Sequence, residues 1–164
     1  MRDIDRALIL AIVLSASGCA ATPSSVRSSP SDAVRVVHAG DRAVGPGPTE
    51  WFTGSARVEM LFAASSPSRV GGATVSFDPG ARTLWHTHPL GPTLLVTEGR
   101  GWVQSWGCPA QPIGAGGVIS IPAGVKHWHG AASDAAMSHI AIQEALGGTA
   151  VHWLEAVSDE QYPE

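Results

Sequence analysis

The sequence predicts a single all-β domain. The chain has 164 residues, enough for one domain with its own hydrophobic core. Its 19 glycines and 12 prolines separate short apolar runs, and few long stretches have apolar residues at helical spacing. Many short strand-like runs separated by turn residues are typical of a β-sandwich or a small β-barrel. We find no internal repeat and no sign of a second domain in the sequence.

The composition is that of an ordinary soluble globule. Hydrophobic residues make up 44% of the chain and charged residues 15%, and the net charge is −4. A nucleic-acid-binding protein usually carries a strong excess of basic residues, which is absent here. We therefore expect no nucleic-acid partner.

The individual strands are predicted from β-branched and aromatic runs bounded by turn chemistry, such as Asp78-Pro79-Gly80 and Gly107-Cys108-Pro109. Near the end of the chain, apolar residues at helical spacing predict a short helix within 151–162, packed on the outside of the barrel. The predicted strands are Val34–His38, Ala56–Ala63, Ala73–Phe77, Thr83–His88, Thr93–Glu98, Gly101–Ser105, Val118–Ile121, Lys126–Gly130 and Met137–Gln143.

The N-terminus predicts export. Residues 1–19 contain a basic start, an apolar run too short to span a bilayer, and small residues directly before Cys19. That ending resembles a bacterial lipoprotein box, so we expect a signal peptide of the lipoprotein type and a lipidated Cys19. Plain secretion and a cytoplasmic protein remain the alternatives. Residues 20–47, rich in Ser, Pro and Ala, are predicted as a flexible tether and the approach to a domain over 48–164.

The second cysteine has no predicted function. An exported protein can pair Cys19 with Cys108, but lipidation of Cys19 leaves Cys108 alone. Cys108 lies between Gly107 and Pro109 in an evident turn, so we interpret it as structural or incidental.

Four of the seven histidines form two His-x-His pairs, His86 with His88 and His127 with His129. Each pair lies in a predicted strand, where residues two apart point to the same face. Two such pairs on adjacent strands of a curved sheet would bring their imidazoles together. Imidazole is the commonest transition-metal ligand in proteins, so the sequence predicts a metal site.

These histidines also carry a family resemblance. The spacing of two glycine- and histidine-containing segments resembles the two sequence patterns of the cupins. The first pattern is matched by Gly80, His86, His88 and Gly99, and the second by Gly116, Pro122, Gly124 and His127. The resemblance implies a single cupin barrel, a double-stranded β-helix or small jelly roll.

A narrower resemblance covers residues 48–162. Segments across this range look like the small single-domain bacterial cupins that include the manganese-dependent (R)-selective hydroxynitrile (mandelonitrile) lyases. They are Trp51–Gly54, Pro79–Gly91, Val96–Trp102, Lys126–Ala132, Met137–Gln143 and Asp159–Tyr162.

This resemblance implies a site. The ligands would be His86, His88 and His127, holding one divalent transition metal, manganese by resemblance, with iron and zinc as alternatives. The catalytic residues would be His139, His129 and Gln143, with Ala73, Val75 and Thr83 lining the substrate pocket. Cupins of this size usually pair through their sheets, so we also expect a homo-oligomer.

The sequence departs from the cupin pattern at Pro92, which stands where the family has a Glu or Gln ligand. Proline has no side-chain donor atom. Water can fill the position, another residue such as Gln143 can move in, or the metal can be lost. The neighbouring Thr93 should face the other way on strand alternation.

Several side chains have two interpretations. In Met137–Gln143 the isoleucines would form the default buried face, and only the resemblance places His139 in the pocket. Trp85 and Trp128 should face away from the metal and pack in the core or at a dimer interface. Arg82 and Lys126 are interpreted as solvated surface charges.

The implied activity is cleavage of a cyanohydrin into an aldehyde and cyanide. The metal would act as a Lewis acid and a pocket histidine, His139 or His129, as the base. Two other classes stay open: an oxygen-dependent or decarboxylase-associated metal enzyme, and a non-catalytic ligand-binding protein of the cell envelope.

Overall fold

Residues 33–163 are described by a computed structural model, and the predicted signal peptide and Cys19 lie outside them. The residues from Val37 onward pack as one unit. Within the described range, no helix suited to spanning a membrane is present. The strands are β1 (Val44–Pro46), β2 (Phe52–Thr53), β3 (Ala56–Phe62), β4 (Val70–Phe77), β5 (Arg82–Thr83), β6 (His86–Thr87), β7 (Pro92–Ser105), β8 (Gln111–Gly114), β9 (Val118–Ser120), β10 (His127–Ala131), β11 (Met137–Glu144) and β12 (His152–Trp153).

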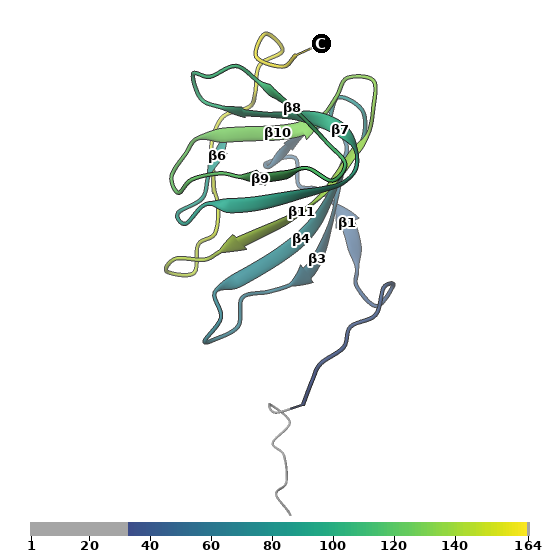
Figure 1. Cartoon of the computed structure of the whole chain (residues 1–164), viewed down its shortest axis with the longest axis vertical. Coiled ribbons are helices and arrows are strands. Elements are labelled where there is room, and N and C mark those ends of the chain that lie inside the picture. The colour runs from purple at the N-terminus through teal and green to yellow at the C-terminus, as the bar shows by residue number, and fades with distance from the viewer. Residues whose placement is uncertain (1–32, 164) are drawn as a thin grey trace, which may run out of the picture. The chain divides into compact units, whose positions relative to one another are not determined.

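These strands form one curled antiparallel sheet, a half-barrel with the order β1-β3-β4-β11-β7-β10-β5-β2 (Figure 1). Strand β6 pairs with β10 and β12, and both β8 and β9 pair with β7. The 14-residue β7 links the two halves, because its first part pairs with β11 and its second part with β10. The all-β prediction is confirmed.

Two glycines allow the sheet to bend at the centre of β7. Gly99 has a φ of 70°, a conformation that side-chain-bearing residues rarely adopt. A Cβ atom on Gly99 would lie 1.9 Å from the carbonyl oxygen of Ala136, and one on Gly101 would lie 1.9 Å from that of Gly130. The backbones of β7 and its neighbours therefore approach more closely than any other residue would permit.

The hydrophobic core lies inside the curl. Phe52, Phe77 and Met137 pack there with smaller apolar residues, and all three are buried. A second cluster places Trp85 and Trp128 against Val157 of the C-terminal segment. Both tryptophans are fully buried, which confirms the prediction that they are core residues.

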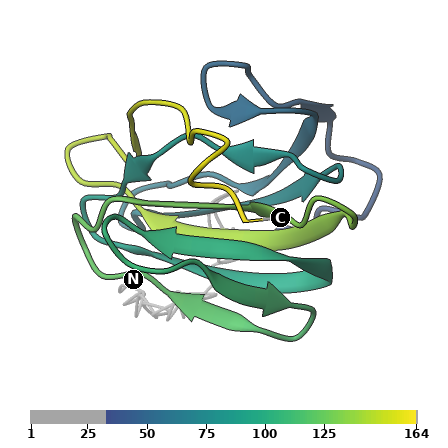
Figure 2. The ribbon, with the colours of Figure 1, turned by 90° about the horizontal axis from the view of Figure 1, so that it is seen from above.

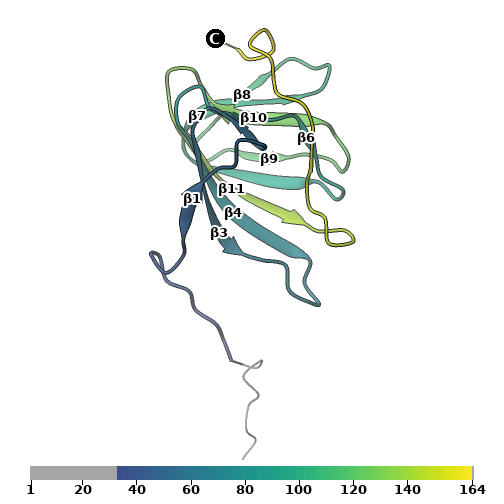
Figure 3. The ribbon, with the colours of Figure 1, turned by 180° about the vertical axis from the view of Figure 1, so that it is seen from behind.

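The C-terminal segment crosses one side of the sheet as an extended chain (yellow in Figures 2 and 3). The prediction of a helix within 151–162 is wrong: β12 pairs with β6, and a turn follows near the end. The apolar residues that suggested a helix instead pack one by one against the sheet, as Val157 does against the two tryptophans.

Arg82 fastens this segment to the sheet. Its guanidinium donates to the Asp159 carboxylate at 2.7 Å and to the Val157 carbonyl at 3.1 Å. It also lies 4.6 Å from the centre of the Tyr162 ring. Arg82 is buried, so the prediction of a solvated charge is wrong. Lys126 is partly exposed, forms an ion pair with Glu155 and lies 3.4 Å from the centre of the Trp106 ring.

The other differences from the predicted strands are local. Val34–His38 is not a strand, and the run predicted as Thr83–His88 is split into β5 and β6. The separate strands predicted around residues 93–105 are one continuous strand, β7. Strands β1, β2, β8 and β12 were not predicted.

Candidate metal centre and substrate cavity

His86 and His127 form the base of the site. They are direct cross-strand partners on β6 and β10, and their ring centres are 4.2 Å apart. On the other side of β6, His86 is paired with Trp153 of β12, and those rings are 4.8 Å apart. Since cross-strand partners point to the same face of a sheet, the pairing itself brings the two imidazoles together.

Backbone carbonyls fix the protonation of both rings. The Nδ1 atom of His86 lies 2.9 Å from the Leu84 carbonyl oxygen, and that of His127 lies 2.8 Å from the Val125 oxygen. A carbonyl only accepts hydrogen bonds, so each Nδ1 carries the proton and each Nε2 keeps its lone pair. This outer-shell arrangement is the one that orients metal-binding histidines.

Two more histidines complete the cluster. Ligand atoms of His86, His127 and His129 all lie within 4.8 Å of one another. His88 adjoins them, with its ring centre 5.1 Å from that of His86 and 5.5 Å from that of His127. The resemblance implied a ligand set containing His88, whereas the tightest geometric set contains His129. The structure thus brings four imidazoles to one point.

Burial keeps these imidazoles neutral. It is the largest cause of a pKa well below the ordinary value for His86 and His129, and it lowers that of His127. Burial and the neighbouring His127 lower the pKa of His88 to about 4. Neutral imidazole is the form that binds metals, so the rings are ready for a cation at neutral pH.

The residues present fit a transition metal. Buried polar atoms in native proteins almost always have a partner. Here the Nδ1 atoms of His88 and His129 and the Nε2 of His127 are buried without one. An all-imidazole donor set suits zinc, iron, copper and nickel. A cation among these rings would supply the missing partner.

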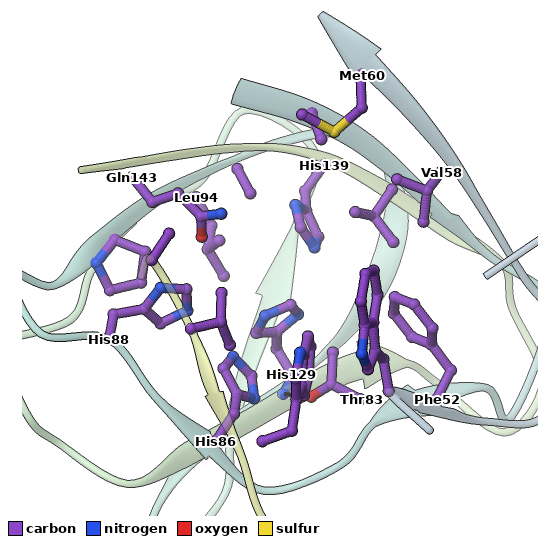
Figure 4. A pocket seen from close by; sticks show the side chains of 18 of the residues that line it. Phe52, Val58, Met60, Thr83, His86, His88, Leu94, His129, His139 and Gln143 are labelled. Carbon is purple, nitrogen blue, oxygen red and sulfur yellow. Dashed lines mark hydrogen bonds between the residues drawn. The ribbon is translucent and has the colours of Figure 1, made fainter. Parts of the chain in front are cut away.

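The cluster lies in a cavity of about 410 Å³ inside the curled sheet (Figure 4). A cavity of this size is in the range of small-molecule sites. Every site residue predicted from the sequence lines it except His127, which is fully buried. Those lining residues are Ala73, Val75, Thr83, His86, His88, His129, His139 and Gln143.

His139 reaches the cavity from β11, opposite the other histidines (Figure 4). It is fully buried, its ring centre is 4.7 Å from that of His129, and Phe77 packs against both rings. Neither ring nitrogen has a hydrogen-bond partner. Burial lowers the pKa of His139 to about 4, so the ring is a neutral proton acceptor at pH 7.

The rest of the cavity wall is mostly apolar, and most of its residues were not predicted from the sequence. Trp51 and Trp153 stack with ring centres 5.4 Å apart, and Phe52 packs against Trp153. The wall is completed by Val58, Met60, Pro92, Leu94, Ala141 and the C-terminal residues Gly148, Thr149, Ala150 and Val151. No local pattern could place the C-terminal residues there, because they reach the cavity only through the pairing of β12 with β6.

Comparison with known proteins agrees with this architecture. Residues 73–143 match the family model described as "Cupin domain". The chain is 54% identical over 129 residues to a protein from Granulicella tundricola named "(R)-mandelonitrile lyase", which covers 79% of this chain and 98% of that protein. The chain belongs to the cupin family.

Solved structures support the same assignment. This cupin is 40% identical to a cupin-like protein from Thermotoga maritima, with a TM-score of 0.67 over 71% of this chain and 89% of that one. A polyketide cyclase from Streptomyces resistomycificus shares the fold at 18% identity, with a TM-score of 0.57 over 79% of this chain and 91% of that one.

Proposed function

We propose that this cupin is a metal-dependent lyase that cleaves cyanohydrins into an aldehyde and hydrogen cyanide. The observation that carries the proposal is a cluster of neutral imidazoles inside an otherwise apolar cavity, where His88, His127 and His129 each keep a buried ring nitrogen without a hydrogen-bond partner. The name of the relative, a mandelonitrile lyase at 54% identity, supports this reaction over the others that the fold hosts.

The proposed cofactor is one divalent transition metal held by His86 and His127, together with His88 or His129. Manganese is proposed from the resemblance, while the imidazole donors also accept iron and zinc. When bound, the metal supplies a Lewis acid and a positive charge at the histidine end of the cavity.

His139 is proposed as the base. It lies outside the tightest ligand group, and neither of its ring nitrogens is held by a hydrogen bond. The nitrogen that is unprotonated in the neutral ring can therefore accept a proton. The hydroxyl proton of the cyanohydrin passes to His139 while the oxygen forms the carbonyl double bond. The carbon–carbon bond breaks and its electron pair leaves with cyanide, which then takes the proton from His139. The anion beside the ring favours the protonated imidazole at the moment when His139 carries the proton.

The apolar wall binds the organic part of the substrate. Phe52 and Trp153 offer aromatic surface close to the histidines, since the Trp153 ring lies against His86. Burial of the substrate there excludes water and strengthens the electrostatic interactions of the reacting groups.

Export and assembly are part of the proposal. The sequence of residues 1–19 supports a lipid anchor at Cys19. A homo-oligomer is proposed from the resemblance, because cupins of this size usually pair through their sheets. Membrane fractionation of cells tests the anchor: the wild-type protein should sediment with membranes and a Cys19→Ala variant should not. A wild-type protein found only in the soluble fraction would contradict it.

The reaction is tested with the two enantiomers of mandelonitrile and metal-loaded protein. We expect release of benzaldehyde, faster from the R enantiomer, and a large loss in His139→Leu with the metal content unchanged. Equal activity of that variant would remove His139 from the mechanism. No cleavage, but oxygen uptake with another substrate, would favour the oxygen-dependent class.

A further inference from the structure

We propose that the side-chain amide oxygen of Gln143 is a ligand of the metal and replaces the donor that Pro92 cannot provide. The inference rests on the proposed metal centre and adds one residue to its coordination. The sequence leaves three outcomes open at Pro92: water, a substitute residue, or loss of the metal. The strand pairing favours the substitute.

The register places Gln143 beside Pro92. Strands β11 and β7 are antiparallel, and Gln143 and Pro92 are direct partners at the end of their ladder. Partners in an antiparallel pair have neighbouring Cβ atoms on the same face of the sheet. Both residues line the cavity, so a donor lost from β7 at this level can be supplied from β11.

The side chain of Gln143 points into the cavity on the side of His88 (Figure 4). His88 is buried and its Nδ1 has no hydrogen-bond partner. This end of the cavity therefore holds two side chains with potential ligand atoms: His88, which lies outside the tightest group of three histidines, and Gln143 with its amide. Together they would complete the coordination around His86 and His127.

The other oxygen donors of the cavity are less suited. Among the described residues that line it, there is no Asp, Glu or Asn. The hydroxyl oxygen of Thr83 already accepts the backbone N–H of His129 at 3.2 Å. Thr149 belongs to the turn that follows Leu146, where these two residues form a backbone bridge. Gln143 offers the one side-chain carbonyl oxygen of this lining, and carbonyl oxygen is a ligand that suits manganese.

A neutral ligand has a consequence for charge. If imidazoles and an amide are the only protein ligands, no ligand carries a negative charge that would offset the charge of a divalent cation. Gln143→Glu keeps an oxygen at the same place and adds a negative charge, so it should bind Mn²⁺ more tightly than the wild type does. Gln143→Leu removes the oxygen and keeps a similar volume.

The test measures metal binding and does not depend on activity. Protein freed of metal by chelation is titrated with Mn²⁺ and, separately, with Zn²⁺, and bound metal is quantified by equilibrium dialysis with elemental analysis. Gln143→Leu should raise the Mn²⁺ dissociation constant roughly 10- to 100-fold, the range typical when a residue that supports a metal site is removed. Pro92→Gln in the Gln143→Leu background should restore it. Gln111→Leu, an exposed glutamine on β8, is the matched control and should bind as the wild type does.

Unchanged Mn²⁺ binding in Gln143→Leu overturns the inference and leaves the proposed lyase untouched. Failure of the wild type to bind either metal overturns both. Binding that depends on Gln143 without any cyanohydrin cleavage sustains the inference and removes the proposed function.

Discussion

Acidification should destabilise the metal-free protein through His139, a buried histidine whose ring nitrogens form no hydrogen bond. Its folded pKa is about 4 because the ring is buried, against an ordinary value of 6.5. Between these values the unfolded chain binds a proton that the folded chain does not. The stabilisation from a neutral His139 is therefore complete above pH 6.5 and is lost as the pH falls towards 4. Between pH 7 and pH 5 this single group costs about 2 kcal/mol of unfolding free energy.

Urea unfolding of chelator-treated protein at pH 7 and pH 5 measures this loss. The other buried histidines shift in the same direction, so the total decrease should exceed that from His139 alone. His139→Leu, which cannot titrate, should show a decrease smaller by about 2 kcal/mol. An identical pH dependence in the two proteins would refute the reasoning, because it would mean that His139 is protonated as easily in the folded state as in the unfolded one.

Three further changes test separate parts of the structure. His86→Ala should abolish metal binding, seen by elemental analysis as the loss of about one equivalent per chain. Arg82→Met removes the charged hydrogen bond to the Val157 carbonyl and should lower the unfolding free energy in urea by about 2 kcal/mol; an unchanged value would mean that the C-terminal segment is held by other contacts. Trp153→Ala should raise KM for an aromatic cyanohydrin roughly three- to tenfold with a smaller effect on kcat, since stacking contacts of this kind contribute about 1 kcal/mol; a change in kcat alone would contradict its role as a binding surface.

Much of the fold was predictable because strand signals are local. Alternation in the two His-x-His pairs indicated correctly that each pair shares a face, and the turn residues marked most strand ends. The register of β6 against β10 was not predictable from composition or period, yet this register sets the His86–His127 contact. The resemblance to the cupins implied that His86 and His127 bind the same metal, but it did not give the register.

His139 shows where local patterns fail. On apolarity alone, the isoleucines of β11 would be the buried face, but His139 is fully buried and Ile140 and Ile142 are half-buried. The outer face of this strand is only partly covered, whereas its inner face is enclosed by the curl of the sheet. Which face of β11 is buried depends on the curvature of the whole sheet, and that curvature cannot be predicted from the sequence of one strand.

The C-terminal segment shows the same limit at longer range. Val151, Leu154 and Val157 fit a helical period, but β6 offers an unpaired edge that residues 152–153 complete. Arg82, more than seventy residues earlier, then fixes the segment through Asp159. Neither the edge nor the guanidinium can be recognised from the segment itself, so the aromatic wall that contains Trp153 was missed.

The most direct test of the account is the rate of benzaldehyde release from (R)-mandelonitrile by one sample before chelation, after chelation and after reloading with Mn²⁺. The account predicts activity that disappears when the metal is removed and returns with it, in the wild type and not in His86→Ala. Activity that persists in fully metal-free protein, or that is equal in His86→Ala, would contradict the claim that the histidine cluster is a metal-dependent lyase centre.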